Sequence, residues 1–214
     1  MKLYTYFRSS AAFRVRIALN LKGIAYESVG VDLRAGRRDH AQPEYLALNP
    51  QGLIPTLQDN GKIISQSLAM LEYLEEVYPE PPLLPKAALE RAAVRSMALG
   101  IACDIHPLNN LRVLNYLRTP AGLDEEAVKA WGRHWITAGF RGIEEQARRL
   151  TGDGQHMFGT DTSLADVCLV PQMYNAVRLK CDLESFPTLR AISAYLQSQT
   201  AFRTAAPEAQ ADAS

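Results

Sequence analysis

Apolar and polar positions in the first third of the chain follow strand and helix periods in turn. Leu3 to Phe7 is a short apolar and aromatic run, which predicts a buried strand. Apolar residues then recur at four-residue spacing from Phe13 to Leu21, which predicts a helix that ends at Gly23. Tyr26 to Val31 predicts a second strand. A strand, a helix and a strand in this order form a parallel pair joined by a crossover helix.

The next segment predicts a loop, a short helix and a hairpin. Arg34 to His40 is polar and loop-like, and Pro43 to Leu48 predicts a short helix. Asn60-Gly61 separates two short strand patterns, Thr56 to Gln58 and Lys62 to Ile64, and this dipeptide is typical of a two-residue hairpin turn.

A last amphipathic helix completes this region. Apolar residues recur every three positions from Leu68 to Val77, with glutamates on the other side, and Pro79 ends the pattern. The crossover pair and the antiparallel hairpin together predict a mixed sheet of the thioredoxin type. We assign residues 1–80 to this α/β domain.

The second region has only helical patterns. Pro79 to Pro85 contains four prolines and is typical of a linker between domains. Ala87 to Arg118 predicts a long helix bent at Pro107, and Glu125 to Leu150 predicts another. We therefore assign residues 87–214 to an all-α domain.

The last helices carry local signals for where they begin and end. Ser163 and Asp166 have the spacing of a capping box, and Pro171 in the following helix predicts a kink. Pro187 opens the last helical pattern, and Ala205 to Ser214 is predicted to be a frayed tail.

Composition narrows the function classes. Apolar residues make up 47% of the 214, enough for a substantial core. Lys and Arg equal Asp and Glu at 23 each, whereas nucleic-acid-binding proteins normally have a basic excess. No apolar run approaches the roughly 18 to 20 residues that span a bilayer. The chain start lacks the pattern of a signal peptide. We expect a cytoplasmic protein that binds neither nucleic acid nor membranes.

Cysteine and histidine spacing argues against a disulfide framework and a metal site. The chain has an odd number of cysteines, and none of them forms a C-x-x-C pair, which favours a reducing compartment. They are Cys103, Cys168 and Cys181. The four histidines show no metal-ligand spacing, so no metal is expected.

Two polar turns could bind an anion or a peptide. Arg8-Ser9-Ser10 lies between a strand and a helix start, where a hydroxyl can donate to a thiolate, although either serine could simply cap the helix. Gln66-Ser67 precedes another helix and could hold an amino-acid carboxylate or provide a plain cap. A cis peptide bond at Ile54-Pro55 would leave the backbone of Ile54 open to a pairing peptide, but most such bonds are trans.

A further polar cluster lies in the helical region. His106 and Asn110 are four residues apart in the long helical pattern, with Arg112 close by. They could line a site or hydrogen-bond within a bundle. Arg178, taken alone, is typical of a solvated surface residue.

Together these stretches resemble the zeta class of glutathione transferases over essentially the whole chain. Tyr6 to Leu19 is the most specific segment, against the family pattern R-S-S-C-x-W-R-V-R-I-A-L. Further matches follow in order at Ala47 to Pro50, Ile54 to Leu57, Gln66 to Ala69, Leu164 to Gln172 and Asn175 to Arg178. The resemblance implies an α/β thioredoxin-like N-terminal domain, an all-α C-terminal domain and a homodimer.

The resemblance also implies roles toward glutathione as cofactor. Ser9 would donate to its sulfur, with Ser10 beside it. Ile54, before a cis Pro55, would pair with the cysteinyl backbone. Gln66 and Ser67 would hold the γ-glutamyl end. Three other residues fall at family contact positions, with His40 at the glycine end and both His106 and Asn110 around the thiol and peptide.

The implied activity is cis–trans isomerisation of a small diacid, maleylacetoacetate, to fumarylacetoacetate in tyrosine or homogentisate breakdown. Reversible addition of the glutathione thiolate would turn the double bond into a rotatable single bond. Arg8 and Arg178, with Arg112 as a weaker third, suit the two carboxylates and the charge that develops on addition.

The chain departs from the family pattern at two positions. Ala11 replaces the usual cysteine and Phe13 the usual tryptophan, so a role for that cysteine is absent here.

Three alternative functions stay open. The first is isomerisation of maleylpyruvate in gentisate breakdown, because Cys103 to Asn110 also resembles enzymes with that activity. The second alternative is conjugation of glutathione to small electrophiles such as halogenated acids. The third is a binding scaffold without catalysis, which would not need a thiol-activating hydroxyl at a helix start.

Overall fold

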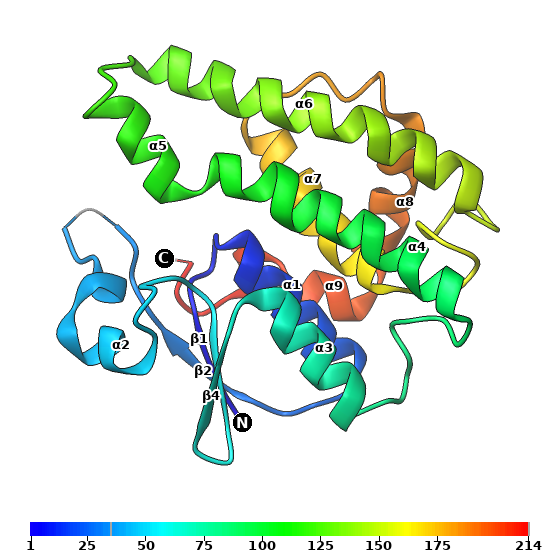
Figure 1. Ribbon diagram of the computed structural model, residues 1–214, viewed down its shortest axis with the longest axis horizontal. Coiled ribbons are helices and arrows are strands. Elements are labelled where there is room, and N and C mark those ends of the chain that lie inside the picture. The colour runs from blue at the N-terminus through cyan, green and yellow to red at the C-terminus, as the bar shows by residue number, and fades with distance from the viewer. Residues whose placement is uncertain (35, 214) are drawn as a thin grey trace. The chain divides into compact units, whose positions relative to one another are not determined.

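The computed structural model describes residues 1–34 and 36–213, and the chain divides into two compact units (Figure 1). The N-terminal unit comprises Met1–Pro82 and the C-terminal segment from Gln199, and the helical unit comprises Leu83–Ser198. Ala35, in the predicted loop, and Ser214, in the predicted tail, lie outside the described residues.

Helices and strands follow the predicted order from β1 to α3. The N-terminal unit has β1 (Lys2–Thr5), α1 (Ser10–Leu21), β2 (Glu27–Gly30), the 3-10 turn η1 (Asp39–Ala41), α2 (Pro43–Leu48), β3 (Thr56–Asp59), β4 (Lys62–Ser65), α3 (Ser67–Val77), α9 (Thr200–Ala205) and η4 (Pro207–Ala209). The helical unit has α4 (Ala88–Leu99), the π-helical η2 (Gly100–Ile105), the 3-10 turn η3 (His106–Asn109), α5 (Leu111–Arg118), α6 (Glu125–Leu150), α7 (Leu164–Arg178) and α8 (Pro187–Ser198).

Within the described residues, the strands form one mixed sheet in the order β2-β1-β3-β4. β1 and β2 are parallel, and β3 runs antiparallel to both β1 and β4. This arrangement confirms the predicted mixed sheet. The hairpin turn is also confirmed, because Asn60 and Gly61 adopt positive φ angles of 46° and 75°, which a two-residue hairpin requires.

The register of the sheet brings four chain segments to one edge. Tyr4 lies opposite Thr56, and Thr56 lies opposite Ser65 on its other side. Thr5 pairs with Gly30 of the parallel strand. The ends of β1, β2 and β4 and the beginning of β3 therefore adjoin one another. The turn before α1, the loop before β3 and the beginning of α3 must all extend from this edge.

Lysine 22 ties the end of α1 to the end of α3. Its ammonium, with a fully buried side chain, lies 2.8 Å from the Glu75 carboxylate. It also donates to the carbonyl oxygens of Tyr78 at 2.7 Å and Pro81 at 3.0 Å. The three donors of one buried ammonium thus fix the start of the proline-rich segment that follows α3.

The long helical pattern from Ala87 to Arg118 is broken in the structure. α4 ends at Leu99, and η2 and η3 separate it from α5. The predicted bend at Pro107 is confirmed as part of this break, because proline has no N–H to donate to the preceding turn.

Two glycines let α6 approach the broken segment closely. A Cβ atom on Gly132 would lie 2.7 Å from Oδ1 of Asn109 and 2.9 Å from Cδ1 of Leu179. A Cβ on Gly139 would overlap the Ile105 side chain. The end of η3 and the end of α7 therefore pack on the same part of α6.

The start of α7 is fixed by the predicted capping box. The carboxylate of Asp166, fully buried, accepts hydrogen bonds from the Ser163 hydroxyl at 2.7 Å and the Met157 N–H at 2.8 Å. Burial raises the pKa of Asp166, and these hydrogen bonds oppose the rise. The helix then runs through Pro171 to Arg178.

The C-terminal segment differs from the prediction. Instead of a frayed tail of the helical domain, it packs on α1 of the N-terminal unit. Asn20 donates to the carbonyl of Ala201 at 3.0 Å, and Arg16 donates to that of Ala205 at 2.9 Å. The assignment of the last residues to 87–214 was wrong because their partners are polar side chains far away in sequence. Such contacts leave no periodic pattern.

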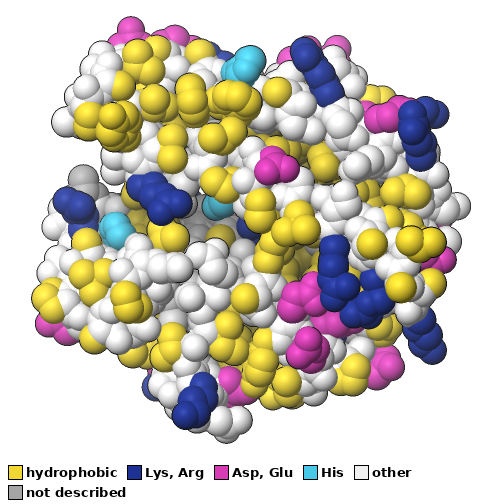
Figure 2. Space-filling model, viewed as in Figure 1, with side chains coloured by type: hydrophobic (Ala, Val, Ile, Leu, Met, Phe, Trp, Pro, Cys, Tyr) yellow, Lys and Arg dark blue, Asp and Glu magenta, His cyan; other side chains and the backbone are white. Residues whose placement is uncertain are grey.

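In the described part of the chain, no helix has the length and apolar character needed to cross a membrane. None of the α5 side chains is fully buried, and Tyr116 is 64% exposed. Figure 2 shows apolar side chains gathered over α5 and the adjoining part of α6. This surface of the helical unit is thus less polar than a typical solvated helix face.

Replacing Lys22 by methionine should lower the free energy of unfolding by about 3 kcal/mol, because it removes a buried cation from beside the Glu75 carboxylate. Urea titration followed by circular dichroism measures this loss. The matched control is Lys2→Met, which removes the exposed pair with Glu27 and should leave the midpoint unchanged. Equal shifts in the two variants would contradict the role given to Lys22.

Candidate functional site

The turn after β1 places Ser9 at the N-cap of α1. Its Oγ accepts the N–H of Ala12 at 3.2 Å, and its own N–H donates to the Tyr6 carbonyl at 2.9 Å. The capping role is therefore present. A hydroxyl that accepts a hydrogen bond still has its own proton to donate, so capping and donation to an anion are compatible. Ser9 is half-buried, whereas Ser10, the first residue of α1, is buried.

Arg8 is held beside this turn by aromatic neighbours. Its guanidinium carbon lies 5.1 Å from the ring centre of Phe7 and 5.8 Å from that of Tyr6. It also donates to the Tyr6 hydroxyl at 3.0 Å. Arg8 itself is exposed, so these contacts position a cation that remains accessible.

The loop before β3 is fixed from behind by a buried hydrogen-bond network. Tyr45 and Asn49 both donate to the carbonyl of Leu53, at 2.7 and 2.9 Å. Both also contact the hydroxyl of Thr56. The peptide bond between Ile54 and Pro55, in the loop from Leu53 to Thr56, is cis. Ile54 lies outside the strand pairing, which begins at Thr56.

The start of α3 differs from the expected cap. Gln66 is the N-cap residue, with a φ of 69°, and Ser67 is the first residue of the helix. Of the two residues that the sequence offered as a cap, Gln66 therefore holds the N-cap position and Ser67 does not. The Gln66 side chain lies on the surface, where its amide donates to Gln51 at 2.7 Å. The N–H groups of the first turn lack helical partners, as at any helix start.

A buried arginine supports this helix start. Arg14, on α1, is 1% exposed and donates from Nη1 to the Ser67 hydroxyl at 3.3 Å. No role was predicted for Arg14, although an arginine within the apolar face of a helix indicates a buried cation that needs polar partners. A positive charge below the first turn of α3 adds to the attraction of that helix start for anions.

His40 lies near the same loop. It is half-buried in η1, and its carbonyl oxygen would lie 3.2 Å from a Cβ on Gly52. In the described part of the chain its Nδ1 is buried without a hydrogen-bond partner. Burial, and then the charge of Arg38, lower the pKa of His40, which favours the neutral ring.

The predicted pair of His106 and Asn110 does not share a helix face. His106 lies in η3, whereas Asn110 is the extended N-cap residue of α5. The Oδ1 of Asn110 accepts the N–H of Arg112 at 3.1 Å. The four-residue spacing failed as an indicator because the helix is interrupted between the two residues.

Arg112 and Arg178 are both exposed, at the start of α5 and the end of α7. Arg178 contacts Oδ1 of Asn175 at 3.4 Å. Their elements converge on α6, because Asn109 and Leu179 both pack on Gly132. The candidate residues thus form two sets, one in each unit.

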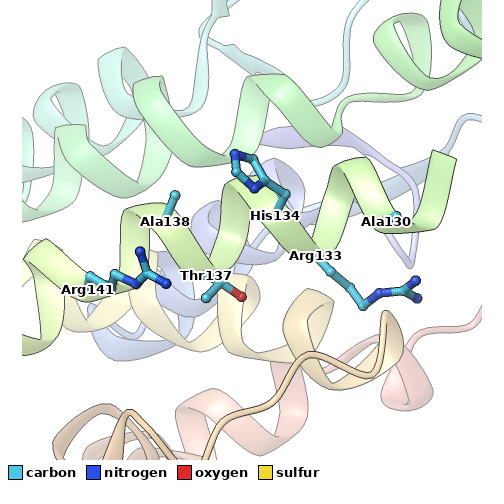
Figure 3. A pocket seen from close by; sticks show the side chains of 6 residues that line it. All are labelled: Ala130, Arg133, His134, Thr137, Ala138 and Arg141. Carbon is cyan, nitrogen blue, oxygen red and sulfur yellow. The ribbon is translucent and has the colours of Figure 1, made fainter. Parts of the chain in front are cut away.

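A depression on the helical unit lies apart from the predicted residues. Figure 3 shows the six side chains that line it, all on α6: Ala130, Arg133, His134, Thr137, Ala138 and Arg141. Arg133 forms an ion pair with Glu126 on the same helix. Within residues 1–34 and 36–213, no group of three or more His, Cys, Asp or Glu side chains is placed to hold a metal ion.

Comparison with known proteins assigns the family. The family model described as glutathione S-transferase, N-terminal domain, matches residues 3–82. A probable maleylacetoacetate isomerase of Vibrio cholerae is 51% identical over 99% of this chain and 97% of its own. The holo structure of a maleylpyruvate isomerase, a bacterial glutathione S-transferase of the zeta class, has a TM-score of 0.97 at 46% identity, with both chains fully covered. The chain belongs to the zeta-class glutathione transferases.

A second solved structure adds bound molecules to the comparison. It is a maleylacetoacetate isomerase from Methylobacterium extorquens AM1 with malonate and glutathione, and its TM-score is 0.95 at 41% identity over the full length of both chains. The zeta-class fold inferred from Tyr6 to Leu19 and the later matches is confirmed, with its thioredoxin-like sheet and its helices.

The capping role of Ser9 can be measured apart from any chemistry. Ser9→Ala should reduce stability by about 1 kcal/mol, because the Ala12 N–H loses its acceptor. Ser9→Asp should retain wild-type stability, since aspartate is as good a cap as serine. Urea unfolding of both variants checks this, and an equal loss in both would show that Oγ does not act as a cap.

Proposed function

We propose that this zeta-class transferase is a glutathione-dependent cis–trans isomerase of a small diacid. The observation that carries the proposal is the Ser9 hydroxyl at the start of α1, whose acceptor is engaged by Ala12 and whose proton stays available. Ser9 follows β1 at the sheet edge where the loop of Ile54 and the start of α3 also meet. The isomerases that match over nearly the full chain support the same activity.

The residues at this edge fit glutathione. The start of α3, with Gln66, Ser67 and the buried Arg14 behind it, suits the γ-glutamyl carboxylate. Ile54, outside the strand pairing, offers its backbone to the cysteinyl residue. His40, whose buried Nδ1 has no hydrogen-bond partner among the described residues, suits the glycine end.

Ser9 would hold the sulfur as a thiolate. A hydroxyl donor and a helix N-terminus both lower a thiol pKa, and Ser10 lies beside it as the first residue of α1. When bound, glutathione supplies the nucleophile that adds to the alkene, permits rotation and leaves again. Ala11 stands in place of the family cysteine, so that thiol has no role here and glutathione would supply the working one.

The arginines would hold the substrate. Arg8 stays accessible on its two aromatic rings, and a guanidinium suits a carboxylate and the negative charge that develops on addition. Arg178 is proposed for a second carboxylate and Arg112 as a weaker contributor. His106 and Asn110 are proposed to contact the thiol and peptide from the helical unit.

Maleylacetoacetate is the proposed substrate, in tyrosine or homogentisate breakdown. Maleylpyruvate, in gentisate breakdown, is the second candidate, because a maleylpyruvate isomerase matches at a TM-score of 0.97. A homodimer and a cytoplasmic location are proposed from the same family likeness. Conjugation of glutathione to small electrophiles is compatible with the same thiol-activating site.

An absorbance assay with maleylacetoacetate and with maleylpyruvate, with and without glutathione, tests the function. We expect glutathione-dependent loss of a cis substrate, and the larger kcat/KM identifies the physiological one. Ser9→Asp, which keeps the cap but cannot donate, should lower kcat/KM about 100-fold. If neither cis substrate is consumed faster with glutathione, the isomerase proposal is wrong.

Arg178→Ala separates substrate binding from cofactor binding. Loss of one charge-assisted contact should raise KM for the diacid roughly 10- to 100-fold, while the Kd for glutathione stays within about twofold. Steady-state kinetics and calorimetry measure the two quantities. Arg148→Ala, which replaces an exposed arginine of α6 paired with Glu145 on the same helix, is the matched control. Equal weakening of substrate and cofactor would remove Arg178 from the substrate role.

A further inference from the structure

Phe7 lies two residues before Ser9, and charged side chains hold both of its backbone polar groups. Its N–H donates to Oδ2 of Asp212 at 2.9 Å. Its carbonyl accepts from Nη2 of Arg16 at 3.0 Å. β1 ends at Thr5, so neither group of Phe7 belongs to the strand pairing. The path of the chain into Ser9 therefore depends on these two side chains.

The Arg16 side chain donates hydrogen bonds to three successive residues that lead into this turn. It is fully buried on α1, and its Nη1 donates to the Thr5 hydroxyl at 3.0 Å and the Tyr6 carbonyl at 3.4 Å. Its Nε donates to the Ala205 carbonyl at 2.9 Å. Burial lowers its pKa to about 10, which leaves it protonated at neutral pH. One guanidinium thus binds both the turn and the C-terminal segment.

The C-terminal segment is held along its length up to Asp212. Asn20 donates to the Ala201 carbonyl, and Gln210 donates to the carbonyls of Thr204 and Ala206. The Cβ of Asp212 lies 3.9 Å from the position of a Cβ on Gly30, at the end of β2. Figure 1 shows the described part of the C-terminal segment, in red, beside the end of β1. Asp212 therefore reaches the same sheet edge as the candidate site.

We propose that Asp212 and Arg16 are positioning residues for the catalytic turn, so that the C-terminal segment is part of the active site. They hydrogen-bond to the peptide groups on either side of Phe7. These two hydrogen bonds set the direction of the Ser9 hydroxyl and of the Arg8 side chain. The inference rests on the proposed function, in which Ser9 stabilises the glutathione thiolate. Asp212 acts through Phe7 and not by touching the cofactor.

A positioning role differs measurably from a merely structural one. A structural anchor changes the thermal midpoint and leaves the chemistry of the folded fraction intact. A positioning residue changes the pKa of the bound thiol, because a misdirected hydroxyl stabilises the thiolate less. The thiol pKa is obtained from the ultraviolet absorbance of the thiolate in the binary complex with glutathione, titrated with pH.

The variants are Asp212→Ala, Asp212→Asn and a chain ending at Gln210. Asp212→Ala should raise the bound thiol pKa by about one unit and lower kcat/KM about tenfold, with the Kd for glutathione within about twofold. The shortened chain should behave like Asp212→Ala, because its Arg16–Ala205 contact remains. Asp212→Asn should recover most of the wild-type values, since its amide oxygen can still accept from Phe7.

Asp182→Asn is the matched control, because that carboxylate accepts the N–H of Glu184 in an exposed turn. It should leave the thiol pKa unchanged. If Asp212→Ala and the shortened chain keep the wild-type thiol pKa, whether or not their thermal midpoints fall, the positioning role is overturned. If the wild-type complex itself shows no lowered thiol pKa, the thiolate role of Ser9 fails, and the inference fails with it.

Discussion

The register of β3 between β1 and β4 is the constraint on which the rest of the N-terminal unit depends. Thr56 pairs with Tyr4 on one side and with Ser65 on the other. Because side chains alternate across a strand, a slip of one residue would turn Leu57 out of the core and Thr56 away from Tyr45 and Asn49. It would also shift Ile54 relative to the starts of α1 and α3. The Asn60-Gly61 turn and the buried Thr56 network both fix this register.

Much of the fold was predictable because its determinants are local and periodic. The apolar spacing from Phe13 to Leu21, the Asn60-Gly61 turn and the break at Pro107 each act within a few residues of chain. The positions of the helix caps were harder to predict from the sequence. Ser67 follows the N-cap by one residue, and Asn110 became a cap only because the helix before it is interrupted.

The polar contacts that organise the candidate site leave no such pattern. Arg14 reaches Ser67 across 53 residues of sequence, and Arg16 reaches Ala205 across 189. Sequence reasoning found the residues proposed to touch glutathione through a family resemblance, and it missed the buried cations behind them. A buried guanidinium needs several acceptors, and only the folded chain shows which carbonyls provide them. The roles of Ser9 and Arg178 remain predictions that the proposed experiments test.

The backbone of Gln66 has a consequence for the balance between stability and function. Its φ of 69° is a conformation that glycine adopts readily and that costs a residue with a side chain on the order of 1 kcal/mol. A chain selected for stability alone would carry glycine there. Glutamine at this position is accounted for by the binding role proposed for its side chain, which glycine could not provide. The backbone at the start of α3 is therefore a local cost in stability, which the proposed glutathione site would explain.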